Sequence, residues 1–196
     1  MKKNNGFTLV ELLAVIVILA VIALIATPVV LSMIESSRKG AAESSMLSYA
    51  QATENTILTK MMNSTSSINY DQTYSVTGLT LTSATESSGT ITVHKNCLNK
   101  TTPATEEDGT GTNGACDPAT QTVNPAYIAF NIELKGDQPV ANAGNYMTVS
   151  ENTVTVAKLK FGKYYVSYFY EKSTGTTTYC SSTSAFAADA TNCQPA

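Results

Sequence analysis

The sequence predicts an α+β protein in which a long N-terminal helix, transmembrane in its first half, packs on an antiparallel β-sheet head. Three successive patterns along the chain support this fold class. An uncharged apolar run comes first, and apolar side chains at helical spacing come next. Segments that alternate apolar and polar side chains make up much of the remainder. The first two patterns are typical of helices, and the third is typical of strands with one buried face.

The uncharged run extends from Leu12 to Ile34 and contains 23 residues. About 20 apolar residues suffice to cross the hydrocarbon core of a bilayer, so we expect this run to span a membrane. Lys2 and Lys3 lie just before it, which predicts a cytoplasmic N-terminus. A secretory signal would have a shorter apolar run followed by a small-residue cleavage site. Here the small residue Gly6 precedes the apolar run instead.

The helical pattern continues beyond Ile34 but becomes amphipathic, which predicts that one face of this half packs against a partner. A single helix over about residues 7–62 would be roughly 84 Å long at 1.5 Å per residue. Gly40 is a predicted weak point within it, because glycine is a poor helix former. The apolar residues that recur at helical spacing are Ala42, Met46, Ala50, Ile57 and Met61, with Leu47 and Leu58 beside them.

The remainder of the chain predicts a globular β-rich head over residues 63–196. The most aromatic segment is expected to be a central strand with one face in the core, and a turn is expected at Phe161-Gly162. Residues 99–125 are expected to form a long loop, and residues 173–196 a Thr/Ser/Ala-rich tail. The expected strands are 74–82, 90–94, 126–134, 153–160 and the aromatic segment 163–171.

The chain contains four cysteines, all in its C-terminal part: Cys97, Cys116, Cys180 and Cys193. An even number of cysteines behind an export-type N-terminus indicates two disulfides and an oxidising compartment. Four cysteines allow three connectivities. The pairing favoured is Cys97–Cys116 with Cys180–Cys193, because each pair brackets a loop rich in small polar residues.

The composition argues against several functional classes. The net charge is −3, and an acidic chain lacks the basic surface that binding to nucleic-acid phosphates requires. The single histidine, His94, is expected to be exposed on a Thr-rich strand. The acidic stretch from Glu106 to Asp117 lacks the spacing of a calcium loop, so we expect a solvated loop there. Because no catalytic set or phosphate-binding loop stands out, we expect no enzyme activity, no cofactor and no metal site.

The segment Gly6-Phe7-Thr8-Leu9-Val10-Glu11-Leu12-Leu13 carries the functional argument. A carboxylate beside an apolar run is costly to desolvate unless it is paired, so Glu11 is a candidate functional residue. Cleavage between Gly6 and Phe7 would create a cation, the α-amino group of Phe7, one helical turn before Glu11. In a bundle of staggered identical helices, Glu11 of one subunit would meet this amine of its neighbour and fix the axial stagger.

This segment, with its short basic leader, resembles the class III signal of type IV prepilins and type II secretion pseudopilins. In that family a membrane aspartyl peptidase cuts after the glycine and methylates the new N-terminal residue, which implies Gly6 and Phe7 here. Glu11 matches the family's assembly glutamate. Pro28 matches a proline common in the same helix, where its missing N–H and its clash with the carbonyl of Leu24 predict a kink. The resemblance is specific over about residues 1–30.

The resemblance implies a filament subunit with a leader at residues 1–6, a filament-core helix at 7–34 and an amphipathic half at 35–62. Its partners would be a prepilin peptidase and methyltransferase, an assembly platform with its ATPase, and other pilins in a helical polymer. The precursor would reside in the cell membrane and the polymer would be extracellular. A pilus for adhesion, twitching or aggregation is favoured. A pseudopilin of type II secretion, a competence pilin for DNA uptake and a membrane-anchored binding head that never polymerises remain alternatives.

Overall fold

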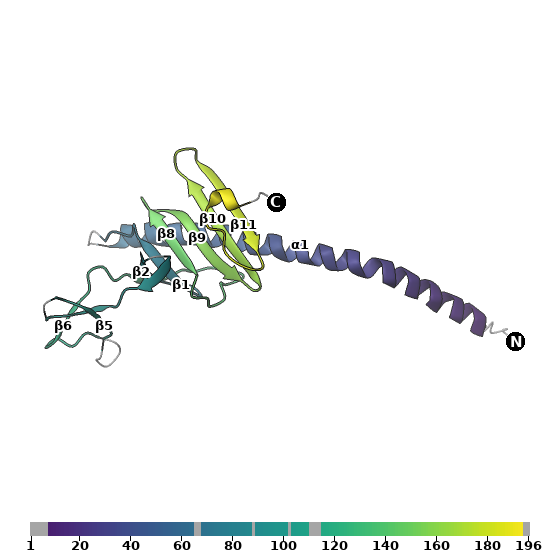
Figure 1. Cartoon of the computed structure of the whole chain (residues 1–196), viewed down its shortest axis with the longest axis horizontal. Helices are drawn as coiled ribbons and strands as arrows, with labels where there is room; N and C mark the ends of the chain where they lie inside the picture. Colours follow the sequence, from purple (N-terminus) through teal and green to yellow (C-terminus); the bar gives the residue numbers. More distant parts are fainter. Residues whose placement is uncertain (1–7, 65–67, 88, 102, 110–114, 194–196) are drawn as a thin grey trace. The chain divides into compact units, whose positions relative to one another are not determined.

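The computed structural model describes residues 8–64, 68–87, 89–101, 103–109 and 115–193. It divides into two compact units, one ending at Gly40 and the other beginning at Ala41. Helix α1 (Leu9–Asn63) supplies most of the first unit and continues into the second, with no break at Gly40 (Figure 1). The single long helix expected from the sequence is therefore confirmed, as is the α+β fold class.

Within the second unit, α1 packs on the sheet through one stripe of side chains. Of the apolar residues expected on this stripe, four are buried, but Leu58 and Met61 are 48% and 41% exposed. Both lie beyond Ile57, the last residue of α1 that the sheet buries, so the buried stripe is shorter than expected. Two buried positions were not anticipated, Tyr49 and Thr53, because an aromatic and a hydroxyl residue do not stand out in an apolar repeat. The buried residues of α1 are Ala42, Met46, Tyr49, Ala50, Thr53 and Ile57.

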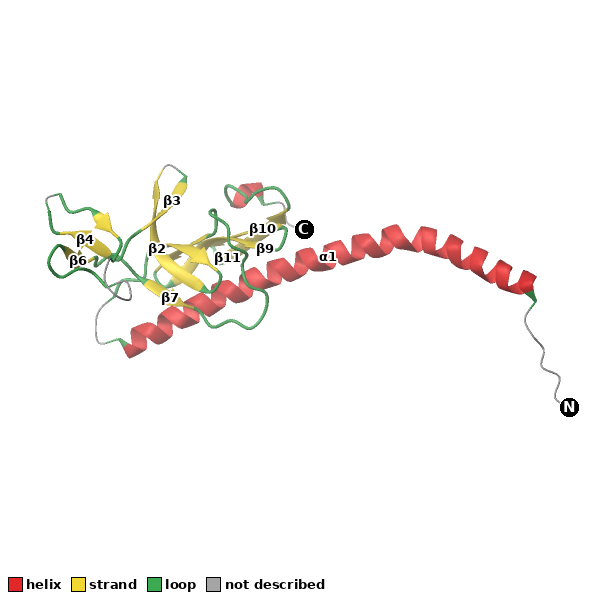
Figure 2. Cartoon of the chain, turned by 90° about the horizontal axis from the view of Figure 1, so that it is seen from below, coloured by secondary structure: helices red, strands yellow, loops and turns green. Residues whose placement is uncertain are grey.

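The main sheet has eight strands in the order β11-β10-β9-β8-β1-β2-β3, and β7 pairs with β2 (Figures 1 and 2). All of its pairings are antiparallel. Its strands are β1 (Thr73–Thr77), β2 (Thr80–Ser87), β3 (Thr90–Val93), β7 (Ala129–Asn131), β8 (Tyr146–Ser150), β9 (Thr153–Phe161), β10 (Tyr164–Glu171) and β11 (Thr176–Ser182).

The core lies between this sheet and the second half of α1. One cross-strand row of the sheet links Tyr74, Met147, Ala157 and Tyr168, and every member is buried. Alternate residues of a strand share a face, so the register of this row directs one face of four neighbouring strands into the same core. Two polar contacts add to the packing. The N–H of Val154 donates to Oε1 of Glu54 at 2.8 Å, and Oγ of Ser181 donates to Oε1 of Glu43 at 2.7 Å.

Several expected strands were placed wrongly. Residues 74–82 form a β-hairpin rather than one strand, because Gly78 adopts a φ of +58° and turns the chain between β1 and β2. Alternation continues on both sides of such a turn, so the pattern alone did not reveal it. The expected strand 126–134 contains only β7. The aromatic strand β10 is interior but second from the sheet edge, because β11 follows it. The turn after β9 begins at Gly162, and Phe161 belongs to the strand.

Three further strands lie within or at the start of the loop expected over residues 99–125. Strands β4 (Cys97–Asn99), β5 (Glu106–Glu107) and β6 (Gln121–Val123) form a small separate sheet in the order β5-β4-β6. The expected long loop is thus partly wrong, because strands of two or three residues are too short to show a period. The expected tail contains β11, and β8 was missed entirely.

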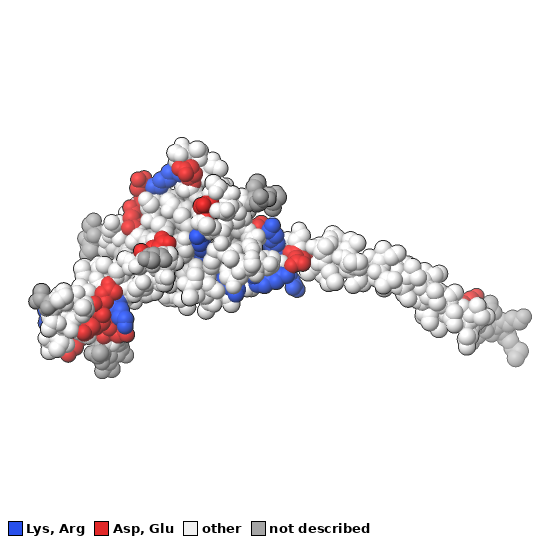
Figure 3. Space-filling model, in the orientation of Figure 1, with Lys and Arg blue, Asp and Glu red and all other residues white. Residues whose placement is uncertain are grey.

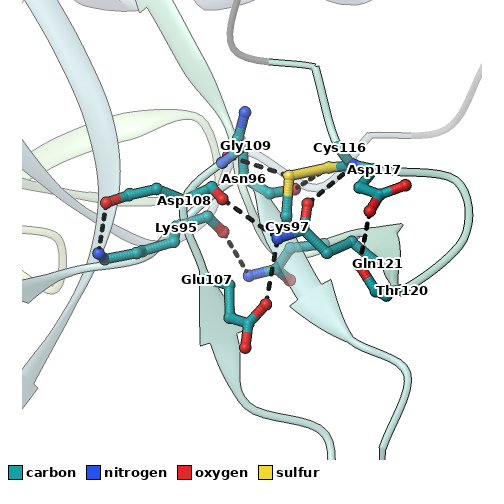
Figure 4. Close-up of a disulfide and its surroundings, with 11 residues drawn as sticks. Lys95, Asn96, Cys97, Glu107, Asp108, Gly109, Cys116, Asp117, Thr120 and Gln121 are labelled. Carbon is teal, nitrogen blue, oxygen red and sulfur yellow. Dashed lines mark hydrogen bonds and ion pairs between the residues drawn. A yellow bond between two sulfur atoms is a disulfide. The ribbon is translucent and has the colours of Figure 1, made fainter. Parts of the chain in front are cut away.

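Both disulfides lie in the second unit and have the pairing favoured from the sequence, Cys97–Cys116 and Cys180–Cys193. The first is embedded in a polar network of the small sheet (Figure 4). Gln121, which is 5% exposed, donates through Nε2 to Oε2 of Glu107 at 3.1 Å and accepts from the N–H of Asp117 at 2.8 Å. Buried amides are costly when unpaired, so this network stabilises the small sheet, which has little apolar core of its own.

His94 connects the main sheet to the small sheet rather than lying exposed on a strand. It follows β3, is half-buried, and its Nδ1 bonds to Oε1 of Glu106 on β5. The hydrogen bond from His94 holds the pKa of the Glu106 carboxyl below its ordinary value, with smaller support from the N–H of Lys95 and from Asn124. Part of the stretch expected to be a solvated acidic loop is therefore an ordered strand.

This contact predicts a pH-dependent contribution to stability. A carboxyl whose pKa is lowered on folding stabilises the fold above its unfolded pKa, and this contribution is lost as the pH falls through the folded value. Glu106→Gln should therefore lower the melting temperature at pH 6, and the difference from the wild type should disappear as the pH falls below the ordinary carboxyl range. His94→Gln and the double variant complete a thermodynamic cycle. A coupling between the two positions that persists after the carboxyl is protonated would contradict the assignment.

Candidate functional site

The candidate site is the first turn of α1, where Thr8 and Glu11 cap each other. Oε2 of Glu11 accepts from the N–H of Thr8 at 2.8 Å and from its hydroxyl at 2.9 Å. In return, Oγ1 of Thr8 accepts from the N–H of Glu11 at 3.3 Å. This reciprocal arrangement is a capping box, which satisfies backbone donors that the first helical turn leaves unpaired. It fixes the Glu11 side chain beside the start of the helix.

The residues after Glu11 form an apolar surface that the first unit does not bury. Every described residue from Thr8 to Ile34 is exposed, and Figure 3 shows the stretch beyond Glu11 without charged side chains as far as the middle of the helix. Among the described residues, α1 is the one helix long and apolar enough to cross a membrane. Such a surface requires either lipid or other apolar helices around it.

The hydroxyl groups within this apolar stretch are satisfied inside the helix. Oγ1 of Thr27 donates to the carbonyl of Ala23 at 2.7 Å, and Oγ of Ser32 donates to the carbonyl of Val29 at 2.8 Å. In an apolar environment an unpaired polar group would be costly, so these bonds keep the surface compatible with lipid. Glu11 is thus the single side chain of residues 8–34 that carries a formal charge.

Pro28 lies within α1, which remains helical on both sides of it. Proline has no N–H, so the carbonyl of Leu24 lacks its usual helical partner. The hydroxyl of Thr27 bonds to a carbonyl of the preceding turn, beside this position. The expected kink at Pro28 remains a prediction. Pro28 is the one residue of the apolar stretch that has no N–H to donate to the helix.

The residues expected to be functional do not form one site. Gly6 and Phe7 lie outside the described residues. Glu11 and Pro28 share α1, and at 1.5 Å per residue they are about 25 Å apart along its axis, so they form no common site. The four cysteines lie in the second unit, where Cys97 of β4 and Cys180 of β11 each pair with a cysteine outside the strands. Thr8 was missed, although a Thr three residues before a Glu at the start of an apolar run is the sequence signature of a capping box.

Nothing in the described part of the chain suggests a catalytic or metal centre. Across residues 8–193, apart from the short gaps already given, no group of three or more His, Cys, Asp and Glu side chains could hold a metal ion. The raised pKa values of the Tyr49, Tyr74 and Tyr168 hydroxyls are caused chiefly by burial against the helix and sheet. They reflect core packing, and the first turn of α1 remains the candidate site.

Comparison with known proteins agrees with this assignment. Residues 1–27 match the family model described as the prokaryotic N-terminal methylation motif. This motif is the class III signal of type IV pilins and pseudopilins, which are structural proteins rather than enzymes. It indicates a pilin-like or pseudopilin precursor, and the motif is a substrate signal for prepilin peptidase. No curated protein and no solved structure matches the chain.

Proposed function

We propose that this chain is the structural subunit of a type IV pilus-like surface filament. The observation that carries the proposal is Glu11, the single formal charge of residues 8–34, held in the first turn of a membrane-length helix and within the matched methylation motif. An acid in this position has a defined partner in a polymer of identical helices, the N-terminal amine of a neighbour. It has no comparable partner in a simple membrane anchor.

Assembly would begin from a precursor in the cell membrane with its N-terminus in the cytoplasm. Removal of residues 1–6 would leave Phe7 as the first residue, and methylation of its amine would keep the cationic charge. An assembly platform with an ATPase would then transfer the subunit from lipid into the growing filament. The apolar surface of residues 7–34 would leave the lipid and pack against the same helices of other subunits. This transfer would explain how a subunit with an exposed apolar surface can become part of an extracellular filament.

The two halves of the helix would have different tasks in the filament. Residues 7–34 would form its core, residues 35–62 would join this core to the head, and residues 63–196 would form the head itself. Pairing between Glu11 and the Phe7 amine of the next subunit would set the axial stagger, because the capping box already holds the carboxylate at the start of the helix. A missing hydrogen bond at Pro28 would allow the core helix to loosen under tension.

The cleavage site provides the direct test. We expect mass spectrometry of protein recovered from the cell surface to find a first residue of methylated Phe7. Gly6→Val should block processing and leave the full-length precursor in the membrane, because a branched side chain would fill the space that a glycine leaves beside the cleaved bond. Gly6→Ala should retain partial processing. Surface protein that still begins at Met1 would contradict the proposal.

Electron microscopy of the same preparation separates the alternatives. Long surface filaments that contain the chain support a pilus subunit. Processed protein that remains in the membrane or in short assemblies, together with a secretion or DNA-uptake defect on deletion, supports a pseudopilin or competence pilin. Unprocessed protein displayed at the surface supports an anchored binding head.

A further inference from the structure

Strand β11 forms one edge of the main sheet in the described part of the chain. Strand β11 is the last strand of the sheet, and β10 is its neighbour on one side (Figure 1). In an antiparallel pair only alternate residues direct their N–H and C=O groups to the neighbour, so the other residues of β11 direct theirs outward. Among the described residues, no backbone hydrogen bond joins this outer side of β11 to another segment.

This edge also lacks the features that usually protect an edge strand. Natural proteins protect sheet edges with charged side chains, proline, a β-bulge or a very short strand. Strand β11 has seven residues with the sequence TTTYCSS, so it contains neither a charge nor a proline. Its register with β10 is regular from Thr176 to Ser182, without a bulge. The opposite edge strand, β3, is only four residues long.

Residues 183–193 lie over a face of the sheet, and no backbone hydrogen bond joins these described residues to β11. The N–H of Ala187 donates to Oγ of Ser167 at 2.9 Å, and the ring of Phe186 meets the ring of Tyr165 edge-on at 5.1 Å. Tyr165 and Ser167 belong to β10 and alternate with its core residues. The central side chain of β11, Tyr179, remains 40% exposed.

We propose that β11 pairs in antiparallel orientation with β11 of a second copy, centred on Tyr179. In this register Tyr179 lies opposite its own counterpart, Thr177 lies opposite Ser181, and Thr176 lies opposite Ser182. Directly opposite aromatic pairs and hydroxyl pairs stabilise antiparallel strands, whereas like charges would destabilise them. Because β11 is uncharged, pairing it with itself brings no like charges together. The aromatic and hydroxyl pairs of this register cover five of the seven positions, and the other two pair Thr178 with Cys180, which is joined to Cys193.

Such a contact has two-fold symmetry and closes on itself as a pair of heads. It therefore differs from polymerisation through α1, which continues indefinitely, and it does not depend on the proposed filament. If the filament forms, the same contact would join heads of different filaments side by side. The inference thus assigns a lateral interaction surface to one strand, with a second copy of this chain as its partner.

The test uses two full-length variants in detergent, Tyr179→Lys and Tyr179→Glu, with a zero-length carbodiimide that joins only a carboxylate and an amine in contact. Each variant alone should give no cross-link at position 179, because like charges then lie opposite each other. The mixture should give a covalent dimer, and mass spectrometry should locate the bond between the two substituted positions. The mapped site of the bond therefore reports the β11 contact itself, separately from any association through α1.

A second pair of variants tests the register of the two strands and does not depend on a substitution at position 179, which could cause misfolding. Thr176→Lys mixed with Ser182→Glu should cross-link position 176 of one chain to position 182 of the other. Thr92→Lys mixed with Thr92→Glu, on the short edge strand β3, is the matched control and should give no cross-link at position 92. An intact Cys180–Cys193 peptide verifies that each variant is folded. Folded variants that fail to cross-link in both mixtures, or that cross-link at other positions, would overturn the proposal.

Discussion

Glu11→Ala should abolish filaments, or reduce them sharply, while membrane insertion, cleavage after Gly6 and folding of the head remain intact. The substitution removes the single formal charge from residues 8–34, so insertion should become easier rather than harder. The incoming subunit would then lack the carboxylate that pairs with the neighbouring amine. Electron microscopy counts the filaments, and immunoblotting of membrane fractions measures the processed subunit. Unchanged filaments would contradict assembly through this residue.

Two matched variants separate the charge of Glu11 from its role in the capping box. Thr8→Val removes the cap of α1 but retains the Glu11 carboxylate, and loss of a cap costs about 1 kcal/mol of helix stability. We expect Thr8→Val to assemble far better than Glu11→Ala, because the intersubunit pair survives. Glu35→Ala removes a carboxylate from the same helix outside the apolar stretch and should assemble normally. Equal defects in Thr8→Val and Glu11→Ala would assign the effect to helix capping instead.

Mixed expression adds an independent measurement of the same pair. A Glu11→Ala subunit still offers its own Phe7 amine to a neighbour that carries Glu11. We therefore expect partial incorporation of the variant into wild-type filaments, detectable by immunogold labelling of a tagged variant. A complete absence of incorporation, with normal processing, would show that the variant subunit fails for a reason other than the missing carboxylate.

Tyr49→Ala should destabilise the head by about 3–5 kcal/mol, which is the range for removing a large buried aromatic side chain. Tyr49 is fully buried on α1, and its hydroxyl donates to the carbonyl of Gly78 at 2.5 Å. It thus joins the helix to the turn between β1 and β2. Small domains have a total stability of about 5–15 kcal/mol, so this loss should remove much of the folded population at growth temperature. Urea unfolding followed by tyrosine fluorescence measures the change.

Tyr49→Phe separates packing from hydrogen bonding at the same position. It keeps the ring in the core but leaves the carbonyl of Gly78 without its donor, so a loss of about 1 kcal/mol is expected. The remainder of the Tyr49→Ala effect then measures the packing of the ring. If the two variants lose the same stability, the ring contributes little and α1 is attached to the sheet mainly by polar contacts.

The parts of the fold that the sequence predicted are those in which a long segment repeats one period. The apolar run and the stripe from Ala42 to Ile57 extend over many turns of α1, so their pattern is unambiguous. The hairpin at Gly78 was missed because alternation on its two sides reads as one strand. Strand β11 was missed because its threonines and serines show no contrast between a buried and an exposed face. Its pairing depends on the register with β10, which only the folded chain provides.

The candidate site shows the same division. Glu11 was identifiable because a single charge beside an uncharged run has few structural explanations. The reciprocal bonds with Thr8 depend on the φ and ψ angles of the first turn, although their residue types are visible in the sequence. The His94–Glu106 contact was not predictable, because it joins two segments through the placement of the small sheet. Contacts between distant segments of this kind have no local signature.

The positions of the two disulfides determine how the head would respond to mechanical force. Cys97–Cys116 and Cys180–Cys193 each close a loop within the part of the chain that follows residue 96, and neither one ties α1 to a strand. A pull applied to the helix would therefore be resisted by non-covalent contacts, including Tyr49 with Gly78 and Glu43 with Ser181. Peeling of the helix from the sheet would be reversible after the tension is released, and its rupture force would be nearly the same under oxidising and reducing conditions.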